Sequence, residues 1–217
     1  MPNLSRCFKG IERRHMEAEN KNLLNEPSTS YTGKYSYADY LTWQLDEMVE
    51  IIRGKLFKMT AAPSRIHQKV AGKLYYHLYG FLAGNPCEVY IAPVDVRLPK
   101  ASIKNEEIYT VVQPDICVIC DKDKLDDAGC NGAPDLIVEI LSPGNNKKEL
   151  QNKYDVYQES GVKEYWIIHP TEQTLMIYTL KSGIYVPSRL FTSGDTITSS
   201  ILLGFSLDLE QFFEDMD

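Results

Sequence analysis

The sequence predicts an α/β protein organised around a mixed β-sheet. Residues 111–120 and 136–141 are nearly continuous apolar segments, the composition expected of strands that are covered on both faces. Residues 64–84 and 147–159 have helical periodicity and flank these strands, and a β-rich tail follows them. The order of helix, strands, helix and strand is that of an α/β or mixed fold. With 217 residues, of which 43% are hydrophobic, the chain is long enough to bury a core of its own.

The N-terminal part of the chain divides near residue 34. Residues 1–34 show no sustained apolar period, so we expect a helical or disordered extension there and a single domain over residues 35–217. Ser36-Tyr37-Ala38-Asp39 has the pattern of a capping box and predicts a short helix. The first long helix is expected over residues 64–84, where apolar residues recur at helical spacing until a Gly-Asn-Pro stop.

Strands are predicted on both sides of this helix. Residues 49–59 predict two short strands that meet at a glycine. In residues 87–98 the apolar residues change parity at Pro93, which predicts one strand with a bulge. The two covered strands at residues 111–120 and 136–141 come next, separated by a polar loop.

The C-terminal third begins with the second long helix. Residues 147–159 place apolar side chains on one side of a helix that ends at Ser160-Gly161. Residues 164–170 and 174–180 then predict strands, and the tail to residue 205 is β-like before a closing helical turn near residues 209–213.

The composition limits the location and the partners of the protein. The chain has no run of about 18 apolar residues, and residues 1–25 are polar and charged, so we expect neither a membrane span nor a signal peptide. We therefore expect a cytoplasmic protein. The net charge of −7 makes tight, non-specific binding to DNA less expected, although it leaves room for a local basic groove.

The cysteines are expected to be reduced thiols. Their odd count of five, in a chain without a recognisable export signal, does not suggest a disulfide framework. Cys117 and Cys120 have the spacing of a zinc or redox pair, but on a strand their thiols face opposite sides, and we assign them to the core. The five residues are Cys7, Cys87, Cys117, Cys120 and Cys130.

Glu139 is the most informative polar residue, because it lies near the end of an apolar segment. An ionised carboxylate in a covered strand is costly unless it is paired or binds a cation. Asp115 would lie beside Glu139 if the two covered strands pair, and Asp95 could join them, whereas Asp135 lies about 13 Å along the same strand. Carboxylates without a Cys/His cluster favour Mg²⁺ over zinc. A hydrolytic or phosphoryl-handling site is the expectation.

Two motifs now carry a family resemblance. Pro114-Asp115, followed on the next strand by Glu139-Ile140-Leu141, resembles the PD-(D/E)xK nuclease superfamily. Its restriction-endonuclease-like αβββαβ core is then implied, here with β-rich additions at both ends. The chain is similar, from about Tyr37 to its C-terminus, to a restriction-endonuclease family common in bacteria, particularly cyanobacteria. Three spaced elements carry this closer match: Gly132 to Pro143, Lys153, and Gly161 to Ile168.

The resemblance implies an endonuclease that hydrolyses DNA phosphodiester bonds with Mg²⁺ or Mn²⁺. Asp115 and Glu139 would hold the ion, with the main-chain carbonyl of Ile140 as a further ligand, and the metal would acidify a water. The superfamily lysine two residues after the glutamate is replaced by Leu141. The resemblance implies that Lys153, on the following helix, supplies it.

Each of these three main candidates also has a structural alternative. Asp115 could simply form part of a turn, as Pro-Asp pairs commonly do at the start of a strand. Glu139 could form a structural ion pair with a buried Arg or Lys. Lys153 follows Glu149 by four residues and could form a surface pair on its helix.

His67, Asp95 and Gln151 are second candidates for contacts to metal, water or phosphate. His67 lies one residue away from the apolar positions of its helix, so a capping or exposed histidine is as well supported as a catalytic one. 

Two functional hypotheses of different classes remain. The favoured one is the metal-dependent DNA endonuclease; the alternative is a non-catalytic protein- or DNA-binding module that retains the fold, transposon-associated or regulatory. The acidic charge and the missing strand lysine support the alternative. Catalysis needs Asp115, Glu139 and Lys153 to converge in a cleft, whereas a binding module could leave them apart or salt-bridged. We expect a homodimer, because two sites cut both strands of a two-fold symmetric duplex most simply.

Overall fold

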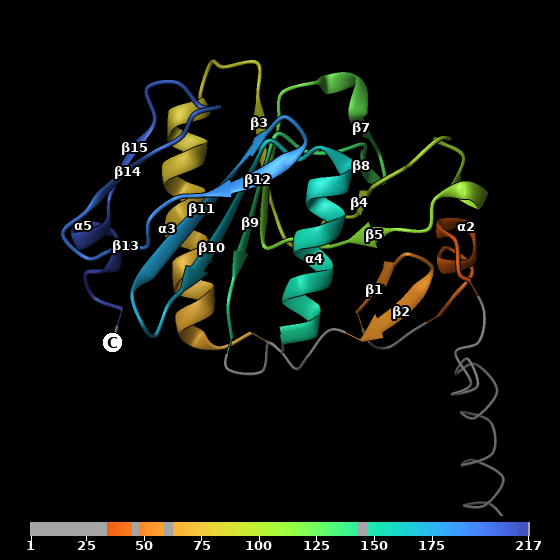
Figure 1. The fold of residues 1–217 in the computed structure, drawn as a ribbon, viewed down its shortest axis with the longest axis horizontal. Helices are drawn as coiled ribbons and strands as arrows, with labels where there is room; N and C mark the ends of the chain where they lie inside the picture. Colours follow the sequence, from red (N-terminus) through yellow and green to blue (C-terminus); the bar gives the residue numbers. More distant parts are fainter. Residues whose placement is uncertain (1–33, 45–47, 59–62, 143–146, 217) are drawn as a thin grey trace, which may run out of the picture.

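The computed structural model describes residues 34–44, 48–58, 63–142 and 147–216, shown in colour in Figure 1. The extension predicted for residues 1–34 lies outside the described residues, apart from Lys34. Within them the chain forms two larger sheets, one two-stranded sheet and several helices. The mixed α/β fold predicted from the sequence is confirmed.

The main sheet has the spatial order β12-β11-β10-β9-β6-β3, with β13 paired to β11. Strands β9 and β10 run parallel and the other neighbours run antiparallel, so the sheet is mixed. The strands are β3 (Glu88–Ile91), β6 (Ile116–Ile119), β9 (Leu136–Ile140), β10 (Glu164–His169), β11 (Thr174–Lys181), β12 (Ile184–Pro187) and β13 (Phe191–Thr192).

A second sheet lies beside the main one and has the order β2-β1-β5-β4-β8-β7. Its strands are β1 (Val49–Ile52), β2 (Lys55–Lys58), β4 (Val96–Arg97), β5 (Val111–Val112), β7 (Leu125–Asp126) and β8 (Gly129–Asn131). The predicted hairpin of residues 49–59 is therefore confirmed as β1 and β2. In the C-terminal tail β14 (Thr196–Thr198) pairs with β15 (Ser206–Asp208).

The helices agree closely with the sequence patterns. They are α2 (Tyr37–Tyr40), α3 (Arg65–Leu82), α4 (Lys147–Ser160) and α5 (Leu209–Phe213), with short 3₁₀ turns η2 (Asn105–Glu107) and η3 (Lys122–Lys124). Ser36 and Asp39 form the predicted capping box at α2, and the Ser64 hydroxyl accepts the backbone N–H of His67 at the start of α3. None of the described helices is long and apolar enough to span a membrane.

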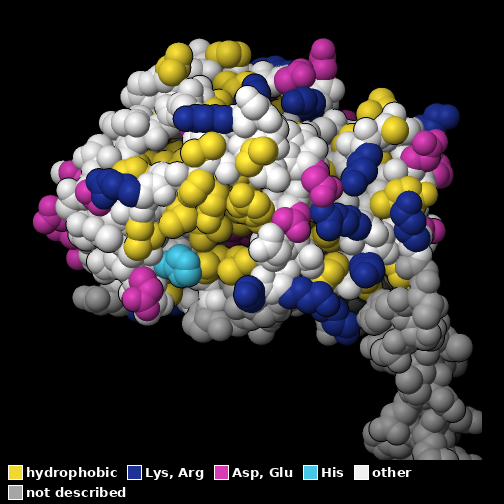
Figure 2. All heavy atoms as spheres, in the orientation of Figure 1, with side chains coloured by type: hydrophobic (Ala, Val, Ile, Leu, Met, Phe, Trp, Pro, Cys, Tyr) yellow, Lys and Arg dark blue, Asp and Glu magenta, His cyan; other side chains and the backbone are white. Residues whose placement is uncertain are grey.

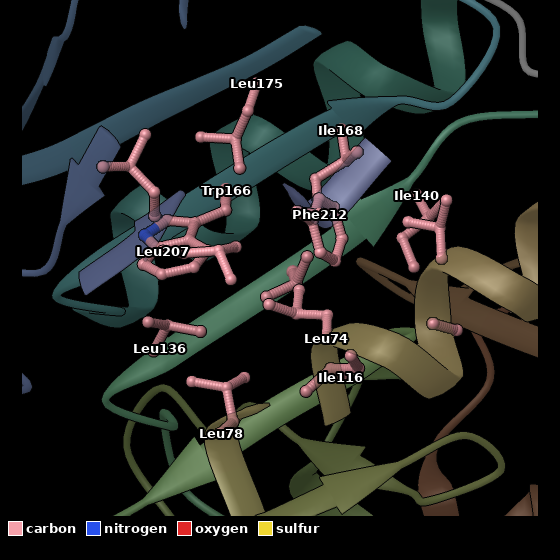
Figure 3. Close-up of a cluster of buried hydrophobic side chains, with 14 of the residues drawn as sticks. Leu74, Leu78, Ile116, Leu136, Ile140, Trp166, Ile168, Leu175, Leu207 and Phe212 are labelled. Carbon is pink, nitrogen blue, oxygen red and sulfur yellow. The ribbon is translucent and has the colours of Figure 1, made fainter. Parts of the chain in front are cut away.

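Helices α3 and α4 cover opposite faces of the main sheet (Figure 1). Figure 3 shows the α3 side, where Leu74 and Leu78 pack against Leu136 and Trp166 of the sheet. On the other face Val156 of α4 packs with alternate residues of the same strands. Because side chains alternate along a strand, β6 and β9 are apolar on both faces, which explains their continuous apolar sequences. In chain order α3, β3, β6, β9, α4 and β10 reproduce the αβββαβ core.

Two strand predictions are wrong, and a proline lies at each error. Residues 87–98 do not form one bulged strand, because β3 belongs to the main sheet and β4 to the second, with a cis Ala92–Pro93 bond between them. Residues 111–120 likewise divide into β5 and β6 on either side of Pro114. Proline has no N–H to donate to a ladder, and the chain changes sheets at these positions. The polar loop before β9 also contains a short hairpin, β7 and β8.

The prediction of reduced thiols is wrong for two cysteines. Cys87 and Cys120 form a disulfide. Their positions explain the bond, since Glu88 pairs with Ile119 in the β3–β6 ladder and the two cysteines are the next residues outward. Cys117 and Cys130 are free and buried, in agreement with a core role for Cys117.

Candidate active site

Strand pairing brings Asp115 and Glu139 to the same edge of the main sheet. Ile116 of β6 lies opposite Val138 of β9, so Asp115, the residue before β6, lies next to the end of β9. The backbone N–H of Ile140 donates a hydrogen bond of 2.7 Å to Asp115 Oδ2. The N-terminal ends of α3 and α4 lie along the same edge, at the bottom of Figure 1. The expected pairing of the two covered strands is therefore present.

Helix α4 brings Lys153 to Glu139. Lys153 is only 4% exposed. Its Nζ lies 3.0 Å from Glu139 Oε1 and 3.1 Å from Glu139 Oε2, and it also lies 3.1 Å from Glu50 Oε1. The alternative of a surface pair with Glu149 is therefore wrong, because the ammonium is buried between two other carboxylates. Asp115, Glu139 and Lys153, which are far apart in the sequence, converge at one edge of the sheet.

Glu50 is a member of this cluster that the sequence reasoning missed. It lies on β1, is 3% exposed, and accepts the backbone N–H of Gln113 at 2.9 Å in addition to the Lys153 ammonium. Its signal was present, because Val49-Glu50-Ile51-Ile52 places a carboxylate inside an apolar strand just as the Glu139 segment does. What the sequence did not show is that β1 lies against α4.

Tyr157 is a second member that was missed. It lies one turn after Lys153 on α4, is fully buried, and its hydroxyl donates a hydrogen bond of 2.6 Å to Glu139 Oε1. In the sequence it occupies an apolar position of the helix, and its ring does pack in the core on this side of the sheet. A tyrosine in an apolar stripe gives no sign that its hydroxyl reaches a carboxylate.

His67 contacts Asp115 from the first turn of α3. It is 6% exposed, which excludes the exposed histidine considered above, and its Nε2 lies 3.1 Å from Asp115 Oδ1. Burial alone would lower the pKa of His67, but the hydrogen bond and charge of Asp115, with smaller contributions from Glu139 and Ile140, give a net raised pKa. His67 Nδ1 is buried and has no partner among the described residues.

The charges in this cluster do not balance. Three carboxylates, those of Glu50, Asp115 and Glu139, face the Lys153 ammonium and the His67 imidazole. Burial raises the pKa of Glu139 to about 7; the Lys153 charge opposes this rise, and the charges of Asp115 and Glu50 add to it. Burial would lower the pKa of Lys153, but Glu139 and Glu50 together raise it, so the ammonium stays charged. With Glu139 ionised, the carboxylates outnumber the cationic groups of the cluster, and a bound cation would reduce this excess of negative charge.

The other two candidates lie outside this group of contacts. Asp95 accepts hydrogen bonds from the Tyr37 hydroxyl at 3.0 Å and from Gln113 Nε2 at 2.8 Å. Among the described contacts, Asp95 is linked to the cluster through Gln113, whose backbone N–H donates to Glu50. Gln151 is exposed and donates to Asp155 on its own helix at 2.8 Å, and its position on α4 points about 200° away from that of Lys153.

The donor atoms fit a hard divalent cation. Asp115 and Glu139 supply carboxylate oxygens at one edge, and the backbone of Ile140 lies beside Asp115. Among the described residues, no three His, Cys, Asp or Glu side chains gather closely enough to hold a metal by themselves. Mg²⁺ usually keeps several waters and is held through one or two carboxylates together with substrate phosphate, so a site of this kind needs no larger protein cage.

The fold that carries this cluster is nuclease-like. A solved structure described as "a putative nuclease belonging to DUF820" from Anabaena variabilis matches with a TM-score of 0.64, over 82% of this chain and 97% of that one. The two sequences are 17% identical, so this likeness shows the shared fold.

Residues 37–210 match the Uma2 family, described as "Putative restriction endonuclease", and the chain belongs to that family. The resemblance to a restriction-endonuclease family, noted in the sequence, is therefore confirmed. The chain is also 25% identical over 191 residues to "Uncharacterized protein slr1290" from Synechocystis, which covers 86% of this chain and 96% of that protein.

Proposed function

We propose that the protein is a divalent-metal-dependent endonuclease that hydrolyses DNA phosphodiester bonds. The observation that carries this proposal is the convergence of Asp115, Glu139 and Lys153 at the ends of two paired strands, with an excess of negative charge. The description of the family and that of the Anabaena protein support the class of reaction. We extend the proposal to residues 35–217 as the nuclease domain and to residues 1–34 as an extension of it.

Asp115, Glu139 and the carbonyl of Ile140 would hold Mg²⁺ or Mn²⁺. When bound, such an ion acidifies a water and neutralises charge on the scissile phosphate. The remaining chemistry belongs to the protein. His67 and the Ile140 N–H fix the two oxygens of Asp115, so the carboxylate keeps one orientation.

Lys153 opposes the protonation of Glu139 that burial favours, although burial prevails and the pKa of Glu139 stays raised, at about 7. The three short contacts of its ammonium are all to carboxylate oxygens of Glu139 and Glu50. A positive charge held in this buried position also stabilises negative charge that develops on a phosphate at the edge of the sheet. Asp95 would act at a distance, through Gln113 and Glu50, and we assign no catalytic role to Gln151.

The edge that carries this site is also basic on its flanks. Lys147 and Lys148 are exposed in the first turn of α4, and Arg65 and Lys69 are exposed in the first turns of α3. Figure 2 shows Lys and Arg side chains gathered over the β1–β2 hairpin and the N-terminal end of α4. These charges would contact the DNA backbone despite the net charge of −7, because phosphate binding depends on the local surface. A homodimer and a cytoplasmic location remain predictions.

One observation favours the second hypothesis, a non-catalytic binding module. Glu139 and Lys153 are 7% and 4% exposed and are already paired with each other, as a structural ion pair would be. Only Asp115 in this group is partly open to solvent, with 19% of its side chain exposed. A module that kept the fold without the reaction would retain the same contacts.

Plasmid cleavage separates the two hypotheses. Purified protein is incubated with supercoiled and linear plasmid in Mg²⁺ or Mn²⁺, with EDTA, and with Glu139→Ala prepared identically. The endonuclease hypothesis predicts nicking that requires metal and disappears in the variant. The binding module would be supported if folded wild-type protein cleaves neither DNA nor RNA and calorimetry detects no metal binding.

A further inference from the structure

The two oxygens of Glu139 are not equivalent. Oε1 accepts a hydrogen bond from the Tyr157 hydroxyl at 2.6 Å and another from Lys153 Nζ at 3.0 Å. Among the described residues, Oε2 accepts a hydrogen bond from Lys153 Nζ alone, at 3.1 Å. A carboxylate oxygen offers two lone pairs, so Oε1 is fully used, whereas Oε2 keeps one lone pair free.

Tyr157 is held firmly enough to maintain this difference. The residue is fully buried, and its ring packs edge-on against Tyr165 with the ring centres 5.1 Å apart. Its backbone carbonyl accepts the N–H of Val162 at 3.0 Å, which fixes the end of α4. A packed ring has little rotational freedom, so the direction of its hydroxyl is set by the fold and not by Glu139.

Asp115 presents a comparable arrangement. Its Oδ2 accepts the Ile140 N–H and its Oδ1 is paired with His67, so each oxygen keeps one lone pair. The free lone pairs of the two carboxylates are therefore those of Asp115 and of Glu139 Oε2.

We propose that Tyr157 is a positioning residue that occupies Glu139 Oε1 and thereby selects Oε2 as the oxygen offered to the divalent cation. This inference rests on the proposed function, because it concerns the same metal site. Without the hydroxyl, Lys153 remains as a contact to both oxygens, but the plane of the carboxylate is less restrained and its free lone pair is no longer held in one direction. Groups that orient a metal ligand from behind it typically contribute about 10- to 100-fold to metal affinity.

The neighbouring Tyr165 provides a matched control. It is also fully buried in the same cluster, but its hydroxyl has no hydrogen-bond partner among the described residues. Tyr157→Phe and Tyr165→Phe therefore remove the same atom from two touching rings. Only the first removes a hydrogen bond to Glu139.

The experiment measures Mn²⁺ binding without DNA, by calorimetry, for wild type and the two variants. We expect Kd to rise at least about 10-fold for Tyr157→Phe and to stay within about twofold for Tyr165→Phe. In plasmid nicking, the Mn²⁺ requirement of Tyr157→Phe should shift by the same factor, with the rate at saturating Mn²⁺ restored to within a few-fold. If Tyr157→Phe is partly unfolded, the Mn²⁺-induced shift of its urea midpoint supplies the affinity instead.

Wild-type binding distinguishes a failure of this inference from a failure of the proposed function. If wild type binds Mn²⁺ and cleaves DNA but Tyr157→Phe binds equally well, the positioning role is overturned and the endonuclease stands. An equal loss in Tyr165→Phe would also overturn it, because a general packing defect would then explain the effect. If wild type neither binds nor cleaves, both proposals fail together.

Discussion

Replacing Lys153 by methionine should destabilise the protein substantially, although it removes a single side chain. Methionine has a similar length and is flexible, so it can fill the space. It cannot replace the three contacts of 3.0 to 3.1 Å that the ammonium makes to Glu139 and Glu50. The variant therefore leaves two buried carboxylates without a counter-charge.

The magnitude follows from the cost of an uncompensated buried charge. Removing one partner of a buried ion pair typically costs about 3–5 kcal/mol of unfolding free energy. Protonation limits the loss, because the pKa of Glu139 is already raised to about 7 with Lys153 present and will rise further without it. A carboxyl whose folded pKa is raised loses stability as the pH increases above its unfolded value of about 4.5. We therefore expect a loss of about 3 kcal/mol at pH 8 and of about 1 kcal/mol at pH 5.5.

Urea unfolding of wild type and Lys153→Met at both pH values measures this difference. Lys100→Met is the matched control, because Lys100 pairs with Glu159 and both side chains are largely exposed (74% and 41%), so a loss below about 1 kcal/mol is expected. Lys153→Met combined with Glu50→Gln should recover part of the stability, because one of the two buried charges is gone. A loss below about 1 kcal/mol at pH 8, with no dependence on pH, would refute the reasoning.

Three further predictions follow from the same contacts. The pKa of Glu139 is raised to about 7, so below that pH a metal ion must displace a proton to bind. Calorimetry should therefore show Mn²⁺ affinity rising from pH 5.5 to 7.5 and then levelling. A flat profile would contradict this prediction. The buried Glu164 carboxylate accepts hydrogen bonds from Trp166 Nε1, Ser199 and Ser200. Glu164→Gln should therefore lower the unfolding free energy by about 2 kcal/mol in urea, whereas the exposed control Glu172→Gln should lower it by almost nothing. Equal losses of stability in the two variants would contradict this prediction. Lys147→Gln with Lys148→Gln should weaken DNA binding and lower its salt slope by about 2, whereas Lys181→Gln should not; an unchanged slope would exclude these lysines as phosphate contacts.

The elements of the fold could be predicted where one face of an element is apolar along its whole length. Helices α3 and α4 and strands β9 and β10 satisfy this condition, and their positions agree with the sequence patterns. The division of residues 87–98 and 111–120 between two sheets could not be predicted in the same way. Alternation shows which side chains share a face, but it does not show to which sheet a short strand belongs.

The candidate site was predictable to the extent that it depends on adjacent strands. Asp115 and Glu139 belong to two covered strands, and pairing those strands is enough to bring them together. The assignment of Lys153 to the site came from the family resemblance and not from a local pattern. Glu50 and Tyr157 were missed because their roles depend on the packing of β1 and α4 around Glu139, and no local pattern encodes that packing.

The disulfide between Cys87 and Cys120 likewise depends on strand pairing that no local sequence pattern encodes. The odd number of cysteines favoured reduced thiols, but the register of β3 and β6 places Cys87 and Cys120 opposite each other. Disulfides persist mainly in oxidising compartments, so the state of this pair bears directly on the predicted cytoplasmic location. Counting free thiols in protein isolated under native conditions would settle it.

The most direct test of the account is the Mg²⁺-dependent nicking rate of Asp115→Asn, Glu139→Gln and the double variant, each shown to be folded. If the two carboxylates hold one reaction centre, each single substitution should lower the rate by at least about 100-fold, and the double variant should fall little further. A single variant that nicks plasmid within a few-fold of wild type would contradict the assignment of the active site.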